Sequence, residues 1–303
     1  MKLSVVICSH NPRIEAIKRT LDSLRHQTLD QNQWDLIIVD NLSDRRISES
    51  VDVSWHKRSR VIVEPKLGLT HARICGIEES AGDVICFVDD DNVLNQDYLS
   101  ESLRIGREST HLGCWGGEIS AEYEAAPEPW FQKYQGFLVI RPLSRDTWNN
   151  SYSYDDALPC GAGMCVRRCV AIQYRKLCIS STERSELDRR GNSFSSGGDL
   201  DMAYTAIDMG FGTGRFKALH LVHLIPESRL KLKYLLALAF GLAESEVYLN
   251  NLRDETRSLL LKKSSFKSKL FHSVHFLFLP RIEKKVAMAL KRGRNKGLKN
   301  LSQ

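Results

Sequence analysis

The sequence predicts an α/β protein with a parallel sheet and an appended helical region at its carboxyl end. Apolar runs of strand length recur in the first part of the chain, with helix-like segments between them. This alternation is typical of parallel strands joined by crossover helices. Polar residues come directly after these runs, and residues 227–303 carry only helix-like patterns.

Four strands are expected in order along the chain, at residues 2–8, 34–39, 60–63 and 83–88. The first leads into a helix to about residue 27, with Pro12 suited to the first helical position. Its apolar residues recur every three or four positions and predict one buried face: Ile14, Ile17, Leu21 and Leu24. A second helix is expected at about residues 69–81. Together these elements predict a nucleotide-binding half-sheet.

Two regions are expected. Residues 1–226 form the α/β domain, and residues 227–303 form a basic, partly apolar helical region. Within the second region, residues 227–249 show one long helical pattern, and Pro280 begins another that extends to about residue 292.

The net charge of +6 is unevenly distributed along the chain. Residues 253–303 hold 14 Lys and Arg against 3 Asp and Glu, which gives +11 and leaves −5 for residues 1–252. Such a basic tail suits an anionic partner, and the apolar block at residues 270–279 favours a membrane surface over nucleic acid. The alternative is a helix that packs on the body with a solvated basic face.

The eight cysteines form no C-x-x-C pair, so neither a zinc site nor a structural disulfide is expected. The first apolar run, residues 3–8, is too short for the core of a signal peptide, and the longest, residues 234–243, is well short of the ~20 residues that span a bilayer. These features predict a cytoplasmic protein, peripheral on the inner face of the cell membrane if the basic tail binds lipid.

Polar residues at the ends of the strands are the candidate ligand-binding groups, because ligands of open α/β sheets collect at the carboxyl ends of the strands. They are Ser9, His10, Asp40, Glu64 and the run Asp89 to Asp91. No G-x-G-x-x-G comes after the first strand and no G-x-x-x-x-G-K-[ST] occurs. A dinucleotide fold and a phosphate-cradling loop are therefore disfavoured.

Asp89, Asp90 and Asp91 repel one another at the end of a buried strand unless a cation or hydrogen-bond donors neutralise them. Mg²⁺ or Mn²⁺ takes one or two protein carboxylates and completes its shell with water and substrate phosphates. The triplet therefore favours a metal–diphosphate site. The alternative is a set of solvated acids that cap a helix from Asn92 to Leu99.

Six segments in the same order resemble the motifs of one family, the inverting glycosyltransferases of family 2, which have the GT-A fold. The resemblance covers about residues 1–230, and its pieces are residues 4–11, 37–41, 68–76, 85–92, 158–168 and 197–202. It implies a Rossmann-like, mixed and mostly parallel GT-A sheet. It also implies a nucleotide-diphosphate sugar as donor and Mn²⁺ or Mg²⁺ as cofactor.

The resemblance implies a set of nucleotide-binding residues. Asp40 would bind the base, and Ser9 and His10 would line the same pocket. Glu64 and Arg73 would lie near the base and the diphosphate. Asp89 would face the ribose, and Asp90 would belong to the same nucleotide-binding set.

The same resemblance implies the metal and catalytic residues. Asp91 would hold the metal, and His223 would reach the metal or the diphosphate. Asp199 would be the general base for the acceptor hydroxyl, although Asp is also a preferred helix cap. The chain departs from the family at Gly198, where a glutamate is common, and Asp201 is a candidate to replace that carboxylate.

Two further segments allow a functional and a structural interpretation. Aromatic residues between positions 115 and 148 could line an acceptor cleft or form a second core layer. The Ser-, Arg- and Gly-rich run at residues 180–196 could include a lid or have no function.

The leading expectation is a metal-dependent inverting glycosyltransferase that uses a nucleotide-diphosphate sugar, with UDP favoured. The acceptor would be a glycan or a polyprenyl-linked lipid in the synthesis of a bacterial surface polysaccharide. The alternative from another class is a catalytically inactive protein of the GT-A fold that binds nucleotide sugars or acts as a scaffold, motivated by Gly198. A nucleic-acid-binding protein ranks last, and no nucleic-acid partner is expected.

Overall fold

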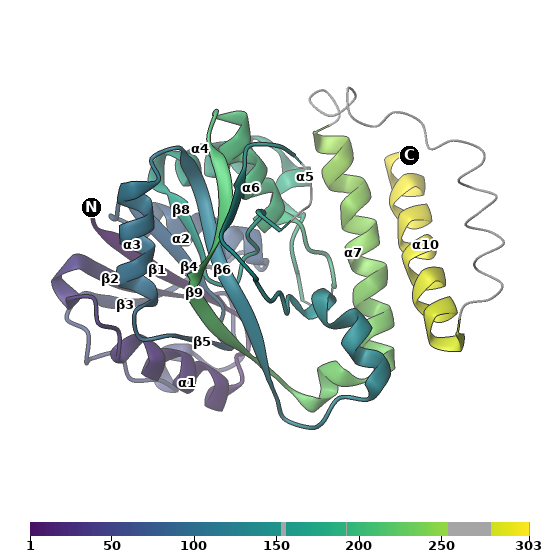
Figure 1. Ribbon diagram of the computed structural model, residues 1–303, viewed down its shortest axis with the longest axis horizontal. Helices are drawn as coiled ribbons and strands as arrows, with labels where there is room; N and C mark the ends of the chain where they lie inside the picture. Colours follow the sequence, from purple (N-terminus) through teal and green to yellow (C-terminus); the bar gives the residue numbers. More distant parts are fainter. Residues whose placement is uncertain (153–155, 192, 254–279, 303) are drawn as a thin grey trace.

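The computed structural model describes residues 1–152, 156–191, 193–253 and 280–302. The apolar block at residues 270–279 lies outside the described residues. Within those ranges a single sheet forms the centre of the molecule (Figure 1). Its strand order is β3-β2-β1-β4-β8-β6-β9-β5, and β7 pairs with β9 outside this path.

The first half of the sheet contains the four predicted strands, all parallel. They are β1 (Leu3–Ser9), β2 (Trp34–Asp40), β3 (Ser59–Val63) and β4 (Val84–Val88). Because they run in one direction, their carboxyl ends share one edge of the sheet. The expectation for this half-sheet is confirmed, with strand ends shifted by a residue or two.

The second half mixes directions. It contains β5 (Asn92–Leu94), β6 (Leu112–Tyr123), β7 (Thr147–Asn149), β8 (Met164–Arg167) and β9 (Gly212–Ile225). Strand β8 is antiparallel to both β4 and β6, whereas β6 and β9 are parallel. Strands β5 and β7 are antiparallel to β9. The sheet is therefore mixed and mostly parallel, as predicted.

Helices cover both faces of the sheet, so the core has two parts. Val5 and Ile7 belong to one apolar cluster with residues of α1 (Ile14–Arg25) and α3 (Tyr98–Glu108). Val6 belongs to the other, with residues of α2 (Leu69–Glu79), α4 (Arg168–Ser180) and α6 (Gly198–Asp208). Alternate side chains of a strand point to opposite faces, and a strand covered on both faces is apolar throughout.

The expected start of α1 is wrong by two residues. The helix begins at Ile14 rather than Pro12, and Ile14 is 37% exposed instead of buried. The preceding loop is held by Asn11, whose backbone N–H donates to Ser43 Oγ at 3.0 Å and whose side chain donates to Asp44 Oδ2 at 3.1 Å. Arg13 is the N-cap and has an extended backbone with ψ of 113°, so the helical turns begin only after it.

The described part of the carboxyl-terminal region, residues 227–253 and 280–302, contains a short 3-10 helix η4 (Glu227–Leu230) and two long helices, α7 (Leu232–Leu252) and α10 (Arg281–Leu301). The two helices lie side by side (Figure 1). At the end of α7, Arg253 donates to both Asp201 and Asp208 of α6, each at 2.7 Å. In the residues that the structure describes, this region is helical as expected, although α7 begins at Leu232 rather than residue 227 and α10 continues to Leu301 rather than residue 292. The boundary after residue 226 stays a prediction.

Two glycines allow α10 to approach α7 closely. A Cβ at Gly293 would lie 2.2 Å from the Phe240 carbonyl oxygen, and one at Gly297 would lie 2.9 Å from Val247 Cβ. Real Cβ atoms do not come so close to backbone, so any larger residue at position 293 must move α10 away from α7.

Replacement of Gly293 by alanine is expected to loosen α10 from α7 at a cost of about 1–3 kcal/mol, the usual range for overpacking. This exceeds the gain of about 1 kcal/mol from the better helix propensity of alanine. Hydrogen exchange of the α10 amides would measure the change. The matched control is Gly136→Ala, since a Cβ at Gly136 meets nothing within 4 Å. Equal exchange rates in the two variants would contradict the expectation.

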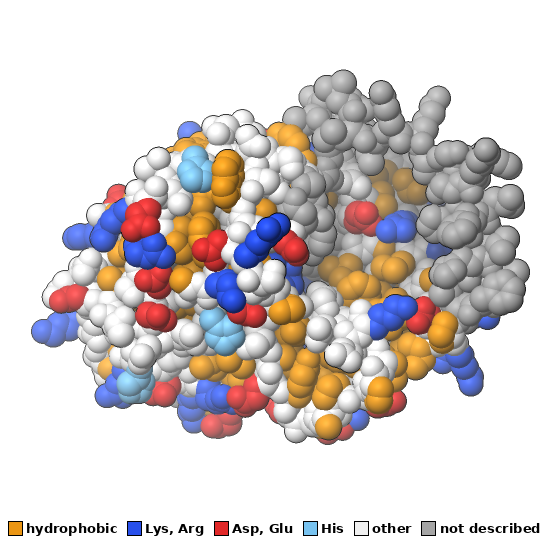
Figure 2. Space-filling view, in the orientation of Figure 1, with side chains coloured by type: hydrophobic (Ala, Val, Ile, Leu, Met, Phe, Trp, Pro, Cys, Tyr) orange, Lys and Arg blue, Asp and Glu red, His pale blue; other side chains and the backbone are white. Residues whose placement is uncertain are grey.

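All eight cysteines are free, in agreement with the expectation that no disulfide forms. In the part of the chain that the structure describes, no helix is both long and apolar enough to cross a bilayer. On the face drawn in Figure 2, acidic and basic side chains are interspersed over the body of the molecule.

Candidate active site

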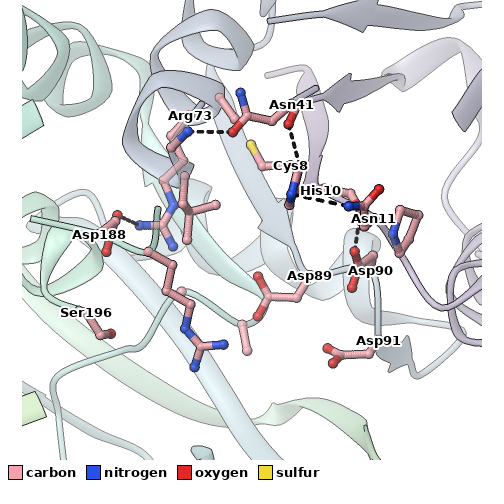
Figure 3. Close-up of a pocket in the computed structure, with 18 of the residues that line it drawn as sticks. Cys8, His10, Asn11, Asn41, Arg73, Asp89, Asp90, Asp91, Asp188 and Ser196 are labelled. Carbon is pink, nitrogen blue, oxygen red and sulfur yellow. Dashed lines mark hydrogen bonds and ion pairs between the residues drawn. The ribbon is translucent and has the colours of Figure 1, made fainter. Parts of the chain in front are cut away.

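A cavity of about 510 Å³ opens where the carboxyl ends of β1, β2 and β4 meet the amino ends of α2 and α6 (Figure 3). Eight of the predicted site residues lie on its wall: Ser9, His10, Arg73, Asp89, Asp90, Asp91, Asp199 and His223. These residues are spread over more than two hundred positions of sequence, and the sheet brings them to one place.

The loop after β1 forms one wall. Ser9 Oγ donates to the Asp90 carboxylate, which ties the ends of β1 and β4 together. His10 Nδ1 donates to the carbonyl oxygen of Asn41 at 2.8 Å. In the tautomer with the proton on Nδ1, Nε2 is an acceptor, and the Asn11 side-chain amide lies 3.4 Å from it.

Asp40 and Glu64 do not line the cavity. The Asp40 carboxylate is 1% exposed and accepts the backbone N–H groups of Ser43 and Ile47 at 2.9 and 3.0 Å, so it shapes the loop after β2. Glu64 accepts the backbone N–H of Lys66 at 2.8 Å. The structure therefore places both carboxylates on local backbone, and their contact with a base stays a prediction.

The residue beside Asp40 takes the wall position instead. Asn41 donates to the carbonyl oxygens of Glu64 and Lys66 at 3.2 and 2.8 Å and accepts the Gly68 N–H at 2.7 Å. Its side chain thereby joins the loops after β2 and β3 to the start of α2.

The aspartate triplet at the end of β4 differs in charge state from one residue to the next. Burial and the neighbouring Asp91 raise the pKa of Asp89, and they raise the pKa of Asp90 to about 7. Burial acts on Asp91 in the same direction, but His223 and Arg229 outweigh it and lower its pKa to about 2. At neutral pH Asp91 is therefore fully ionised, whereas Asp90 is ionised only in part.

The helix-cap interpretation of the triplet is wrong. Residues Asn92–Leu94 form strand β5, and the next helix begins only at Tyr98. The aspartates therefore belong to the cavity and not to a helix end.

Asp91 and His223 have the chemistry of a cation site. His223 Nδ1 donates to the Leu138 carbonyl oxygen at 3.0 Å, and Nε2 faces Asp91 Oδ2 at 3.4 Å, an ion pair if the ring is protonated. In the singly protonated ring Nε2 would be an acceptor, and a positive group between it and Asp91 would satisfy both. Arg229 supplies one, with Nη1 3.0 Å from Asp91 Oδ2 and 3.3 Å from His223 Nε2.

A divalent cation fits the same pair. Within the ranges that the structure describes, no group of three His, Cys, Asp or Glu side chains could hold a metal. One carboxylate and one imidazole, however, agree with the preference of Mg²⁺ and Mn²⁺ for few protein ligands plus substrate phosphates. The bond from His223 Nδ1 to a carbonyl is also the outer contact that metal-binding histidines commonly make.

Asp199 is the second residue of α6, and Gly197 is the N-cap. Asp199 is therefore not the cap that its sequence position also allowed. Its Oδ2 accepts the Gly161 N–H and its Oδ1 the Leu200 N–H, at 2.8 and 2.9 Å. The carboxylate lines the cavity and retains lone pairs that could accept a proton from a bound hydroxyl.

Asp201 does not replace the carboxylate that the motif lacks at Gly198. It is fully buried, and its carboxylate pairs with Arg184 at 2.9 Å and with Arg253 at 2.7 Å. It is also absent from the cavity wall. This expectation is wrong because residue 201 lies on the face of α6 that packs against α5 (Thr182–Ser185) and α7.

The cavity residues that were not predicted include three with polar or charged side chains that bond across the site: Asn41, Asp188 and Arg229. Asn41 comes directly after a strand end, a position that could have indicated it. Asp188 lies in the Ser-, Arg- and Gly-rich run, where no periodicity marks one residue above another. Arg229 falls in a segment expected to be helix, where a basic residue is unremarkable.

The aromatic residues between positions 115 and 148 mostly form core. Trp115 and Phe131 are 0% and 1% exposed, and Trp130, Tyr134 and Phe137 pack against α7 and α10 residues. Trp148 is the exposed member, and none of the aromatic residues in this range lines the cavity.

Glycosyltransferases with the GT-A fold share three features with this structure: the mostly parallel sheet, the acidic residues at the end of β4 and the carboxylate at the start of α6. Residues 4–169, more than half of the chain, match the model of the family described as glycosyl transferase family 2. The chain belongs to this family.

One curated relative is the amylovoran biosynthesis glycosyltransferase AmsB of Erwinia amylovora. It is 36% identical over 110 residues, which cover 35% of this chain and 36% of that protein. The matched segments of the curated relatives span between 15% and 45% of their lengths.

Two solved structures share the fold. The mannosyltransferase PcManGT from Pyrobaculum calidifontis, in complex with GDP-Man and Mn²⁺, has a TM-score of 0.59 at 13% identity and covers 98% of this chain and 87% of that one. TarS from S. aureus, in complex with UDP-GlcNAc, has a TM-score of 0.52 at 14% identity and covers 99% of this chain and 89% of that one. The predicted GT-A fold is confirmed.

Proposed function

We propose that this protein is a metal-dependent inverting glycosyltransferase that moves a sugar from a nucleotide-diphosphate sugar to a glycan or lipid-linked acceptor. One observation carries the proposal: the cation site of Asp91 and His223 and the carboxylate of Asp199 line the same cavity. A single bound donor could therefore place its diphosphate at the first and its sugar near the second.

Several cavity residues suit a donor of this kind. Arg73, Arg189 and Arg229 all line the wall, and guanidinium groups bind phosphate oxygens well. Two similar folds were solved with UDP-GlcNAc and with GDP-Man and Mn²⁺, which supports a nucleotide sugar in general. We favour a UDP-sugar, and the relative in amylovoran biosynthesis favours a role in a bacterial surface polysaccharide.

Asp199 and the pair of Asp91 and His223 have separate roles in the proposed transfer. Asp199 accepts the proton of the acceptor hydroxyl while that oxygen bonds to the anomeric carbon. The bond from the anomeric carbon to the diphosphate oxygen breaks, and the nucleoside diphosphate leaves with the bonding electrons. Attack opposite to the leaving group inverts the configuration at that carbon. A divalent cation held by Asp91 and His223 would neutralise the charge of the departing diphosphate.

The alternative function is a catalytically inactive protein of the same fold that binds nucleotide sugars or serves as a scaffold. Gly198 motivated it, because the usual carboxylate of the motif is missing. It differs from the enzyme in one respect that can be measured, namely nucleotide-sugar binding without transfer.

Thermal unfolding against a panel of UDP-, GDP- and dTDP-sugars, each with Mn²⁺ and with EDTA, tests the donor site. A ligand at 100 times its Kd should stabilise the protein by roughly 2.7 kcal/mol, which shifts Tm visibly. A shift for one nucleotide family that disappears with EDTA would support the proposal and identify the base. A shift without sugar transfer to any acceptor would support the scaffold, and no shift at all would contradict both.

We also propose that α10 brings the enzyme to the inner face of the membrane, where a polyprenyl-linked acceptor would be found. The helix holds eight Lys and Arg against one Glu. Lys285, Met288, Arg292 and Lys299 are exposed and recur along one face of it. A basic face with an apolar residue suits an anionic lipid surface better than a neutral one.

Triple reversal at Lys285, Arg292 and Lys299 to glutamate is expected to weaken binding to phosphatidylglycerol vesicles by at least about 100-fold, since each basic residue near such a surface contributes about 1 kcal/mol. Vesicle flotation would measure it. The matched control reverses Lys57, Lys176 and Lys217, exposed residues of the body, and thereby makes the same change in net charge. Equal loss in both variants, or equal binding of wild type to neutral vesicles, would contradict the role of α10.

A further inference from the structure

Asp188 is a buried carboxylate in the cavity wall, with 5% of its surface exposed. It comes from the loop between α5 and α6, within the run of residues 180–196. In Figure 3 it lies on the opposite side of the view from Asp91, with Asp89 between them. A buried carboxylate is costly unless each oxygen is satisfied, so its partners define its role.

Its two oxygens serve two different elements. Oδ1 accepts the backbone N–H groups of Gly197 and Gly198 at the start of α6, at 3.3 and 2.9 Å. Oδ2 accepts Nη1 of Arg73 at 2.6 Å and the hydroxyl of Thr70 at 3.2 Å, both on α2. Asp188 thereby connects the helix that carries Asp199 to the helix that carries Arg73.

Arg73 continues this connection to Asp199. The guanidinium packs on Gly161, where a Cβ would lie 2.7 Å from Arg73 Nη2. The N–H of Gly161 in turn donates to Asp199 Oδ2. Displacement of Arg73 would therefore also shift Gly161, whose N–H binds the proposed base.

The backbone at Gly198 shows that Asp188 occupies the space of a missing side chain. A Cβ at Gly198 would lie 2.1 Å from Asp188 Oδ2 and 2.7 Å from its Cγ. A side chain at position 198 and the carboxylate of Asp188 thus exclude each other. The glycine is what gives Asp188 room.

We propose that Asp188 supplies, from a distant part of the chain, the carboxylate that the motif lacks at Gly198, and that it is a positioning residue for Asp199 and Arg73. This inference rests on the proposed function, because it takes Asp199 as the base. It also removes the reason for the scaffold alternative, since the site keeps its second carboxylate.

Asp188→Asn separates the two contacts of the side chain, with the start of α6 and with Arg73. The amide oxygen can still accept from Gly197 and Gly198, whereas the amide nitrogen would face the Arg73 guanidinium and break that ion pair. We expect kcat to fall about 100-fold, the cost of a misplacement of ~1 Å, together with a lower Tm, because Arg73 loses its buried ion-pair partner. The probe is the nucleotide sugar that gives the largest shift in the unfolding panel.

The exchange of positions is the sharper test. Gly198→Glu alone should be nearly inactive because it collides with Asp188, and Asp188→Ala alone should be impaired. The double variant should recover at least about 10-fold over either single variant, because coupled residues are not additive. Its crystal structure should show the introduced glutamate within hydrogen-bond distance of Arg73.

Arg184→Gln is the matched control. The substitution removes one ion pair of Asp201, which lies on the same helix as Asp199 but outside the cavity. It should lower Tm without changing kcat. Wild-type kcat in Asp188→Asn, equal loss in Arg184→Gln, or no recovery in the double variant would overturn the inference. A fully active Asp199→Asn would instead overturn the role of Asp199 as the base, and the crystal structure of the double variant would still test the exchange.

Discussion

Asp199→Asn is expected to lower kcat by about 10³-fold, within the range of general-base contributions. The amide cannot take the proton of the acceptor hydroxyl, and its nitrogen cannot accept the Gly161 N–H that Asp199 Oδ2 accepts at 2.8 Å. Transfer measured with the donor from the unfolding panel would show the loss. The ligand-induced shift in Tm should remain, because the donor diphosphate is expected to bind elsewhere in the cavity.

Asp208→Asn provides the control for this variant. Asp208 belongs to the same helix but lies outside the cavity, where it bonds to Arg253 and Tyr152. It should lose stability and keep its kcat. Undiminished transfer in Asp199→Asn would assign the proton to another group, and a lost Tm shift would indicate that Asp199 contributes to donor binding.

Asp91→Asn should give the second-largest effect, a fall in kcat/KM on the order of 100-fold together with loss of the response to Mn²⁺. Asp91 is ionised at neutral pH because His223 and Arg229 outweigh its burial, and asparagine offers no charge to a divalent cation. The Tm shift produced by the donor should become the same with Mn²⁺ and with EDTA.

Asp97→Asn is the control for the metal site, because Asp97 is exposed at the start of α3 and makes no side-chain cap bond. It should respond to Mn²⁺ as wild type does. If Asp91→Asn also kept a normal Mn²⁺ response, the assignment of Asp91 and His223 as the cation site would be wrong. In that case Arg229, which already bonds to both residues, would be the positive group at this position.

Three strands of the first half, β1, β2 and β4, were predictable because they are buried on both faces and are therefore apolar runs. β2 is an example: Leu36 to Val39 are all fully buried. The second half was not, since β5, β7 and β8 are short. The pairing of β8 with β4 joins residues about eighty positions apart, which no local pattern reports.

The site was predictable where a residue lies at or just after the end of a strand, as Ser9 and Asp91 do. It was not predictable where a contact spans the chain. The bond from Arg73 to Asp188 joins residues 115 positions apart, and Gly198 makes sense only once Asp188 is seen against it. Asp40 also lies at the end of a strand but does not line the cavity, because its carboxylate accepts backbone N–H groups of the loop that follows.

The bond between Arg253 and Asp201 limits where the protein can be shortened. Arg253 comes directly after α7 and is 3% exposed. A chain ending at residue 252 would leave Asp201 with Arg184 as its one described ion-pair partner. Asp201 is only two residues from Asp199. Loss of one partner of a buried pair commonly costs several kcal/mol. A shortened protein that ends after Arg253 would keep this pair and lose only residues 254–303. Activity lost on shortening to residue 252 would therefore report on the lowered stability of α6 as much as on any contact made by the tail.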